Sequence, residues 1–395
     1  MIVGIVGKAN VGKSTFFKAL TLADVEIANY PFATVKPNNG IGFVKTECVD
    51  KEFNVECQPR EGVCKHGHRF VPVKVVDVAG LVPGAHEGKG LGNQFLSDLN
   101  QADVLIHVID AAGSTNDKGE PVDSGTYDPV NDVKFLEVEL DFWYLDILKK
   151  GWEKFMRRVQ AEHITAANAL FEQMSGVGVT EDMAKQGVKN LNPQMAKWTE
   201  EELLVLAKEL RIKTKPMIIA ANKADIPGAM DNIARLQKEF PDHTIIPVSA
   251  EAELALKEAD HHGWIDYVPG EGSFALKDNS KMSDKQKHGL DFLKKYLDSH
   301  KTTGVQECIN KAVFDMLKYK VAYPVANPNL TDSDGRILPD CFLLPPQATT
   351  IDFAFKVHSD IGKNFVKAMN MKTKMPVGKD SLIEHRDVIE IMTKK

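Results

Sequence analysis

The chain has 395 residues, of which 43% are hydrophobic and 26% charged, and its formal net charge is −6. This length accommodates two or three domains with cores of their own, and the composition is that of a soluble globular protein. No apolar stretch is as long as a membrane span, and the negative net charge excludes a general attraction to nucleic acid.

The N-terminus continues directly into an apolar strand and lacks the basic start of a signal peptide. Five cysteines in a chain of this length indicate a reducing compartment. We therefore expect a cytoplasmic protein that acts as a monomer and has no membrane partner.

The first motif is a phosphate-binding loop in "VGIVGKANVGKSTFFKAL", where residues 7–14 match G-x-x-x-x-G-K-[ST] between a strand and a helix. Glycines let backbone N–H groups surround phosphate oxygens, Lys13 brings a charge to the β- and γ-phosphates, and Ser14 offers a hydroxyl to Mg²⁺. The predicted nucleotide contacts from this loop are Gly7, Asn10, Val11, Gly12, Lys13, Ser14 and Thr15.

Four soft donors lie close together in "CQPREGVCKHGH": Cys57, Cys64, His66 and His68. Zinc is conceivable there, but the spacing does not match the usual ligand pairs, and a hairpin-like excursion between two strands is the alternative. Cys48, Cys308 and Cys341 are expected to be isolated and packed.

A strand ends at Asp77 in "VPVKVVDVAGL". Its carboxylate is suited to hold Mg²⁺ through water, and the N–H of Gly80 is suited to the γ-phosphate. The alternative is that Asp77 caps a turn. Leu81 follows, where many nucleotide switches have a glutamine, and its side chain cannot orient water.

After the predicted strand Val104 to Asp110, about a hundred residues precede the next core strand, more than one crossover needs. Helical apolar spacing in residues 130–150, 151–174 and 199–212 predicts an insertion of two long helices plus shorter ones. Its basic edge is either a solvated helix face or an RNA contact; it comprises Lys149, Lys150, Lys154, Arg157 and Arg158.

The segment "TKPMIIAANKAD" predicts the base specificity. A buried strand ends at Asn222, and the Asp225 carboxylate matches the N1–H and N2–H₂ edge of guanine, whereas adenine has no such donors. Lys223 can cover the ring with its aliphatic stem, and Asn222 is expected to tie this loop to the phosphate loop. A later strand ends at Ser249 and Ala250, whose N–H groups are suited to the guanine oxygen.

These stretches, with "NYPFATVKPNNG" and "DVAGLVPGAHEGKGLGNQFL", resemble the Obg-related GTPases, and most closely the archaeal YchF-like proteins. The resemblance implies that Thr34 is the switch I threonine that completes the Mg²⁺ shell when GTP is bound; the alternative is an ordinary loop hydroxyl. It also implies that a hydrophobic residue at Leu81 is a family trait. Many YchF relatives that replace the final aspartate prefer ATP; because Asp225 is kept here, we expect GTP.

Catalytic help must then come from a residue other than Leu81. By resemblance, Asn10 helps to bind K⁺ beside the phosphates; the alternative is that Asn10 only tolerates a tight loop conformation. A second candidate is His86 in the glycine-rich "PGAHEGKGLG", either as a group that polarises water or as a solvent-exposed loop residue.

Near the C-terminus, "CFLLPPQATTIDFAFKVHSDIGKNFVKAM" predicts a turn, a strand from Ile351 to Val357 and a helix from about Ser359, with "DVIEIM" as a closing strand. This part resembles a TGS domain, a ubiquitin-like β-grasp module, although Gln347 stands where the family often has glycine. The resemblance implies RNA or the ribosome as a partner.

The predicted fold is an α/β P-loop GTPase domain, a mostly parallel sheet flanked by helices, with a helical insertion and a C-terminal ubiquitin-like β-grasp (TGS) domain. The expected boundaries are 1–126 and 213–275 for the GTP-binding domain, 127–212 for the insertion, 276–320 for a helical connector and 321–395 for the TGS domain. We expect a Mg²⁺-dependent, slowly hydrolysing GTP switch that acts in translation or on RNA. The alternatives are an ATPase and a nucleotide-stabilised RNA- or ribosome-binding adaptor.

Overall fold

The computed structural model describes residues 1–21, 39–78, 98–192, 194–277 and 282–394. They form two compact units: Met1–Phe17 with Val76–Ala250, and Lys18–Val75 with Glu251–Lys395. Thr34, Gly80, Leu81 and His86 lie outside the described residues, so their predicted roles remain predictions.

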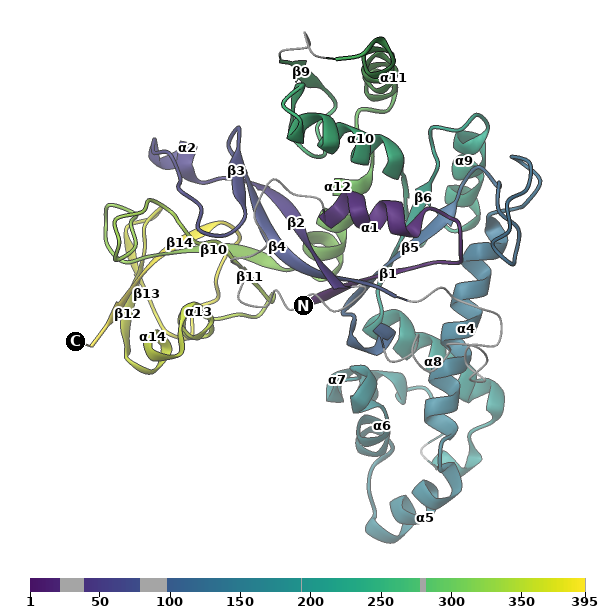
Figure 1. The fold of residues 1–395 in the computed structure, drawn as a ribbon. Coiled ribbons are helices and arrows are strands. Elements are labelled where there is room, and N and C mark those ends of the chain that lie inside the picture. The colour runs from purple at the N-terminus through teal and green to yellow at the C-terminus, as the bar shows by residue number, and fades with distance from the viewer. Residues whose placement is uncertain (22–38, 79–97, 193, 278–281, 395) are drawn as a thin grey trace. The chain divides into compact units, whose positions relative to one another are not determined.

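A parallel sheet forms the centre of the first unit (Figure 1). Its strands β1 (Ile2–Val6), β5 (Val104–Asp110), β6 (Met217–Asn222) and β7 (Thr244–Pro247) pair in this order. β5 and β6 are buried along their whole length, as expected for parallel strands covered on both faces. Because the carboxyl ends of parallel strands share one edge, the loops after β1, β5 and β6 meet there.

Helices follow three of these strands in the chain. The helix α1 (Lys13–Thr21) begins directly after the loop that follows β1, α9 (Ala229–Glu239) follows β6, and α10 (Ala250–His261) follows β7. None of the described helices has the length and apolar character needed to cross a membrane.

The predicted helical insertion is present. It consists of α4 (Val130–Lys149), α5 (Trp152–Glu162), α6 (Ala166–Met174), α7 (Glu181–Gly187) and α8 (Glu200–Thr214), with short 3₁₀ turns at Ser175–Val177 and Met195–Lys197. α8 starts at a capping box formed by Thr199 and Glu202 and packs against α4.

The prediction of one long helix over residues 151–174 is wrong. His163 takes a left-handed conformation with φ of 52° and ends α5, and the Thr165 hydroxyl then accepts the N–H of Asn168 to start α6. Residues 151–174 therefore form two helices, which are separated by residues 163–165.

In the second unit, β2 (Asn39–Glu47) is followed by α2 (Asp50–Phe53) and by a hairpin of β3 (Val63–Lys65) and β4 (His68–Asp77), whose last two residues belong to the first unit. The hairpin shows that this segment makes an excursion between strands, which was the alternative to a zinc site, and it does not by itself decide about zinc. The remaining elements before the C-terminal domain are β8 (Ile265–Tyr267), β9 (Phe274–Leu276), α11 (Asp284–His300), α12 (Val305–Asn310) and a π-helix at Lys311–Met316.

The C-terminal part is a small mixed sheet with a helix packed on it. The strands are β10 (Lys320–Val325), β11 (Phe342–Leu344), β12 (Phe365–Asn370), β13 (Met375–Val377) and β14 (Asp387–Thr393), and their order is β11-β10-β14-β12-β13. The core of this sheet includes Ala322, Phe353 and Ile389. A five-stranded sheet with a covering helix is the β-grasp arrangement expected for a TGS domain.

The predicted strand from Ile351 to Val357 is wrong, because α13 (Thr350–Val357) occupies these residues. Thr349 and Asp352 form a capping box, and the buried residues Thr350, Phe353 and Ala354 follow helical spacing. The helix predicted from Ser359 is α14 (Ser359–Lys363), and the closing strand is β14.

Candidate nucleotide-binding site

The loop after β1 has the backbone of a phosphate cradle. Gly7 has φ of 153°, and a Cβ there would lie 2.4 Å from the carbonyl oxygen of Val108. Gly12 has φ of 90°, and its Cβ would lie 2.2 Å from Nδ2 of Asn222. Both positions therefore require glycine, which keeps the backbone N–H groups close to any bound phosphate.

Lys13 and Asp77 lie together at the start of α1. The Lys13 ammonium donates to Oδ1 of Asp77 at 2.9 Å and to the carbonyl oxygen of Val78 at 3.1 Å. The amide of Val78 donates to Ile5, which fixes this end of β4 beside β1. Ser14 is exposed in the first turn of α1. A serine hydroxyl and a carboxylate are oxygen ligands of the kind that Mg²⁺ prefers, so these residues fit the expected ion.

Asn222 connects the two loops predicted to bind nucleotide. Its Nδ2 donates to the carbonyl oxygen of Val11 at 2.9 Å, and its Oδ1 accepts the N–H of Ala250 at 3.1 Å. The expected tether to the phosphate loop is therefore present. The amide of Ala250 donates to Asn222 and Ser249 is buried, and the predicted contacts of both residues with the guanine oxygen stay predictions.

Lys223 is held in place by residues that sequence reasoning missed. It has φ of 64°, and its ammonium donates to Oδ2 of Asp110 at 2.9 Å and to Oγ of Ser114 at 3.0 Å. Asp110 is fully buried and also accepts hydrogen bonds from the Ser114 and Thr115 hydroxyls. The position of Asp110 at the end of a predicted buried strand was the feature of the sequence that could have indicated this role. These contacts fix the loop that carries the half-buried Asp225.

Asn10 has the left-handed conformation that the sequence allowed for, with φ of 62°. Its Nδ2 donates to the carbonyl oxygen of Gly119 at 2.8 Å, so the loop after β5 contacts the phosphate loop. Gly119 packs closely on Ala9: a Cβ added to Gly119 would lie only 2.8 Å from Ala9. The K⁺ role of Asn10 stays a prediction.

Lys8, the second residue of the phosphate motif, is buried. Its ammonium lies 2.8 Å from Oδ1 of Asp132, 3.0 Å from the carbonyl oxygen of Thr115 and 3.8 Å from the centre of the Tyr127 ring. Burial raises the pKa of Asp132, and the Lys8 charge opposes that effect. No motif in the sequence indicated this pair.

The four donors for which zinc was conceivable, Cys57, Cys64, His66 and His68, do not gather as a set. His66 Nε2 lies 2.8 Å from Oδ2 of Asp266, and His68 Nε2 lies 3.8 Å from Oε1 of Glu271. Cys57 and Cys64 instead lie with Cys48, so the interpretation of Cys48 as isolated is wrong. Cys308 is fully buried and Cys341 partly buried, and neither belongs to that group.

The basic edge of the insertion is partly neutralised by ion pairs. Lys149 lies 2.5 Å from Oε1 of Glu200, and Arg158 pairs with Glu172. These pairs reduce the positive charge available to RNA phosphates on this face.

Three family models match successive parts of the chain. Residues 2–135 match a "50S ribosome-binding GTPase" model, residues 220–327 match "Obg-like GTPase YGR210-like, G4 motif-containing domain", and residues 330–393 match "TGS domain". The matches cover both predicted nucleotide loops and the C-terminal sheet.

Relatives extend the similarity over the whole chain. An uncharacterized GTP-binding protein of Methanocaldococcus jannaschii is 49% identical over 99% of both chains. The Ribosome-binding ATPase YchF of Bacillus subtilis is 31% identical over 65% of this chain and 68% of its own. The crystal structure of a GTP binding protein from Pyrococcus horikoshii OT3 matches with a TM-score of 0.77, 38% identity and full coverage of both chains. The chain therefore belongs to the Obg-like GTPase family, in its YGR210-like, YchF-related branch, with a C-terminal TGS domain.

Proposed function

We propose that the chain is a Mg²⁺-dependent GTP-binding switch that hydrolyses GTP slowly. The observation that carries this proposal is the tether through Asn222, which joins the phosphate loop to the loop bearing Asp225. A carboxylate in that loop pairs with the two donors of guanine, and the adenine edge would leave it unpaired. The 49% identical relative is named a GTP-binding protein, which supports the same nucleotide.

Mg²⁺ would be held by Ser14, Asp77 and Thr34, and it would neutralise charge on the β- and γ-phosphates when bound. Lys13 would bind the same phosphates. Its ammonium now donates to Asp77 and the carbonyl oxygen of Val78, so nucleotide binding requires the ammonium to exchange these partners.

Slow hydrolysis is expected because Leu81 has no hydrogen-bonding group for water. Asn10 and His86 are the proposed sources of catalytic help, the first through K⁺ and the second through its imidazole. His86→Ala, assayed alone and with ribosomes, tests the second source: a lower turnover supports it, and an unchanged turnover removes it.

The principal alternative is an ATPase, which the name of the Bacillus subtilis relative favours. Asp225 argues for GTP, because Asp225 is the group that distinguishes the two bases. In a second alternative, nucleotide only stabilises an RNA- or ribosome-binding adaptor.

We propose the ribosome as the partner and the cytoplasm as the place of action. The match of residues 2–135 to a "50S ribosome-binding GTPase" model and the TGS domain support this partner. Co-sedimentation of the full chain with ribosomes, in a non-hydrolysable GTP analogue and in GDP, tests the switch. Stronger binding in one nucleotide state supports it, equal binding favours the adaptor, and no binding in either state excludes this partner.

Hydrolysis itself is tested by single-turnover assays with Mg²⁺ and GTP. Lys13→Met removes the charge on the phosphates and should abolish binding and turnover together. Lys18→Met, a lysine of the same helix that pairs with Glu258 on the surface, serves as the control. Equal turnover in Lys13→Met and in the unmodified chain would refute the proposed phosphate site.

A further inference from the structure

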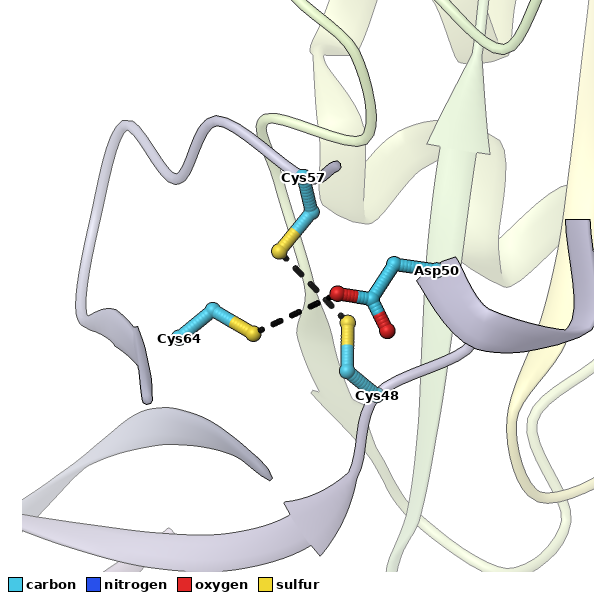
Figure 2. Close-up of side chains that lie close together, drawn as sticks. All are labelled: Cys48, Asp50, Cys57 and Cys64. Carbon is cyan, nitrogen blue, oxygen red and sulfur yellow. Dashed lines mark hydrogen bonds between the residues drawn. The ribbon is translucent and has the colours of Figure 1, made fainter. Parts of the chain in front are cut away.

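Three cysteines and one aspartate converge in the second unit, and none of them is among the residues predicted to bind nucleotide or Mg²⁺ (Figure 2). Their ligand atoms all lie within 4.8 Å of one another. The sulfurs of Cys48 and Cys57 are 3.6 Å apart, and the sulfur of Cys64 is 3.7 Å from Oδ2 of Asp50. Figure 2 shows the four side chains pointing toward a common centre.

The local chain brings these residues together through two tight turns. Cys48 follows β2, Asp50 begins α2, Cys57 lies in the loop after α2, and Cys64 lies in β3. The first turn is at Asn54, with φ of 53°, and the second is at His66 and Gly67, with φ of 52° and 78°. The amide of Cys48 donates to the carbonyl oxygen of Gly67 at 2.8 Å, which closes β2 against the hairpin.

The spacing of the donor atoms fits a tetrahedral ion. With Zn–S bonds of about 2.3 Å, two sulfurs on a tetrahedron lie about 3.8 Å apart, and a sulfur and an oxygen lie slightly closer. The Cys48–Cys57 separation of 3.6 Å and the Cys64–Asp50 separation of 3.7 Å are close to these edges. A set of three thiolates and one carboxylate is also one that zinc accepts, whereas Mg²⁺ prefers sites made of oxygen ligands.

Charge gives a second reason for a cation. Asp50 is 8% exposed, and in the described part of the chain no lysine or arginine forms an ion pair with it. Cys48 and Cys57 are buried beside it. A buried carboxylate without a counter-charge is costly, and a divalent ion among the four donors would remove that cost.

We propose that Cys48, Asp50, Cys57 and Cys64 bind one Zn²⁺ as a structural site. The site replaces the sequence-based set, since His66 and His68 are engaged by Asp266 and Glu271. It binds the ion with four protein ligands, which leaves no open position for catalysis.

The segment that the ion would fix also contacts the C-terminal part of the same unit. The amide of Gln58 donates to Ile337 at 2.8 Å, the amide of Arg60 donates to Pro339 at 2.9 Å, and Lys372 lies 2.7 Å from Glu52. The buried Arg69 guanidinium donates to the carbonyl oxygens of Leu338 and Pro339. Zinc would therefore stabilise the segment that contacts residues 337–339 and the TGS sheet.

The first test measures metal in the full chain purified under reducing conditions without chelator, and again after reconstitution with Zn²⁺ and removal of unbound metal. The proposal predicts about one zinc ion per chain. Cys57→Ser and Cys64→Ser should reduce this content by about tenfold or more. Cys341→Ser, His66→Ala and His68→Ala should keep it. An unmodified chain that retains no zinc after reconstitution, or histidine variants that lose it, would overturn the site.

Because a cysteine variant can fail to fold, a second measurement uses the unmodified chain. Co²⁺ in place of zinc should give the intense visible bands of a tetrahedral ion and the near-ultraviolet charge transfer of thiolate ligands. Asp50→Asn should shift the visible bands and keep the thiolate transition. An octahedral spectrum without the thiolate transition, or a disulfide between Cys48 and Cys57 that persists in protein purified with a thiol reductant, would refute zinc ligation.

Discussion

The buried ammonium of Lys8 lies 2.8 Å from the carboxylate of Asp132, and this pair joins the phosphate loop to the first turn of α4. The two residues are 124 positions apart in the chain. α4 is the longest helix of the insertion, so the loop predicted to bind phosphate and the insertion share one buried charge pair.

Replacing one partner of this pair should be strongly destabilising. Lys8→Met leaves the Asp132 carboxylate buried without a counter-charge, and we expect the free energy of unfolding to fall by about 3–5 kcal/mol. Chemical denaturation followed by circular dichroism measures this change. Lys134→Met is the matched control, since the Lys134–Glu239 pair is exposed and should contribute less than about 1 kcal/mol. Equal losses in the two variants would contradict the importance of the buried pair.

Loss of the Asn222 tether should weaken nucleotide binding. Asn222→Ala removes the partners of the Val11 carbonyl and the Ala250 amide, so we expect affinity for GTP to fall by about tenfold or more. Isothermal titration measures the affinity. Asn310→Ala is the control, because Asn310 makes the same two kinds of bond with Lys45 in the second unit. If both variants keep full affinity, the tether has no role in binding.

A K⁺ requirement would reveal the role of Asn10. We expect GTP hydrolysis to be faster in K⁺ than in Na⁺ at equal ionic strength, because a bound K⁺ adds positive charge beside the phosphates. Asn10→Gly keeps the left-handed backbone and removes the carboxamide, so it should lose the K⁺ advantage. Equal rates in the two salts would leave only the conformational role of Asn10.

His107 should make the protein less stable in acid. Complete burial lowers the pKa of this histidine from 6.5 to about 3, so the folded state keeps it neutral while the unfolded chain protonates it below pH 6.5. The unfolded state therefore binds the extra proton, and stability falls as the pH decreases from 6.5 toward 3.

His107→Leu should remove this histidine's share of the loss of stability in acid. The change of the unfolding free energy with pH should then become shallower by up to about 1.4 kcal/mol per pH unit. Denaturant titrations of both proteins at several pH values between 3 and 7 give the two slopes. Parallel slopes would mean that His107 is not the group that titrates.

Much of the parallel sheet was predictable because its signal is local. The strand Val104–Asp110 has the predicted bounds, since an unbroken apolar run ends at a charged residue. The glycine loop and the tether through Asn222 also followed from motifs at strand ends.

Other features depended on contacts that a linear pattern does not encode. Ile351, Phe353, Phe355 and Val357 alternate like a strand, yet the Thr349 cap and the burial of Phe353 and Ala354 make this segment a helix, with Phe355 49% exposed. Cys48 looked isolated because turns at Asn54 and Gly67 bring it to Cys64, and Lys8 gave no sign of its partner 124 residues away.

The central claim is that the Asp225 carboxylate selects guanine. The most direct measurement is competition of GTP and ATP for a labelled guanine nucleotide on the Mg²⁺-loaded full chain, repeated on Asp225→Ala. We expect GTP to bind at least about 100-fold more tightly than ATP, and we expect the variant to lose this preference. Equal or tighter binding of ATP, or an unchanged preference in Asp225→Ala, would contradict it.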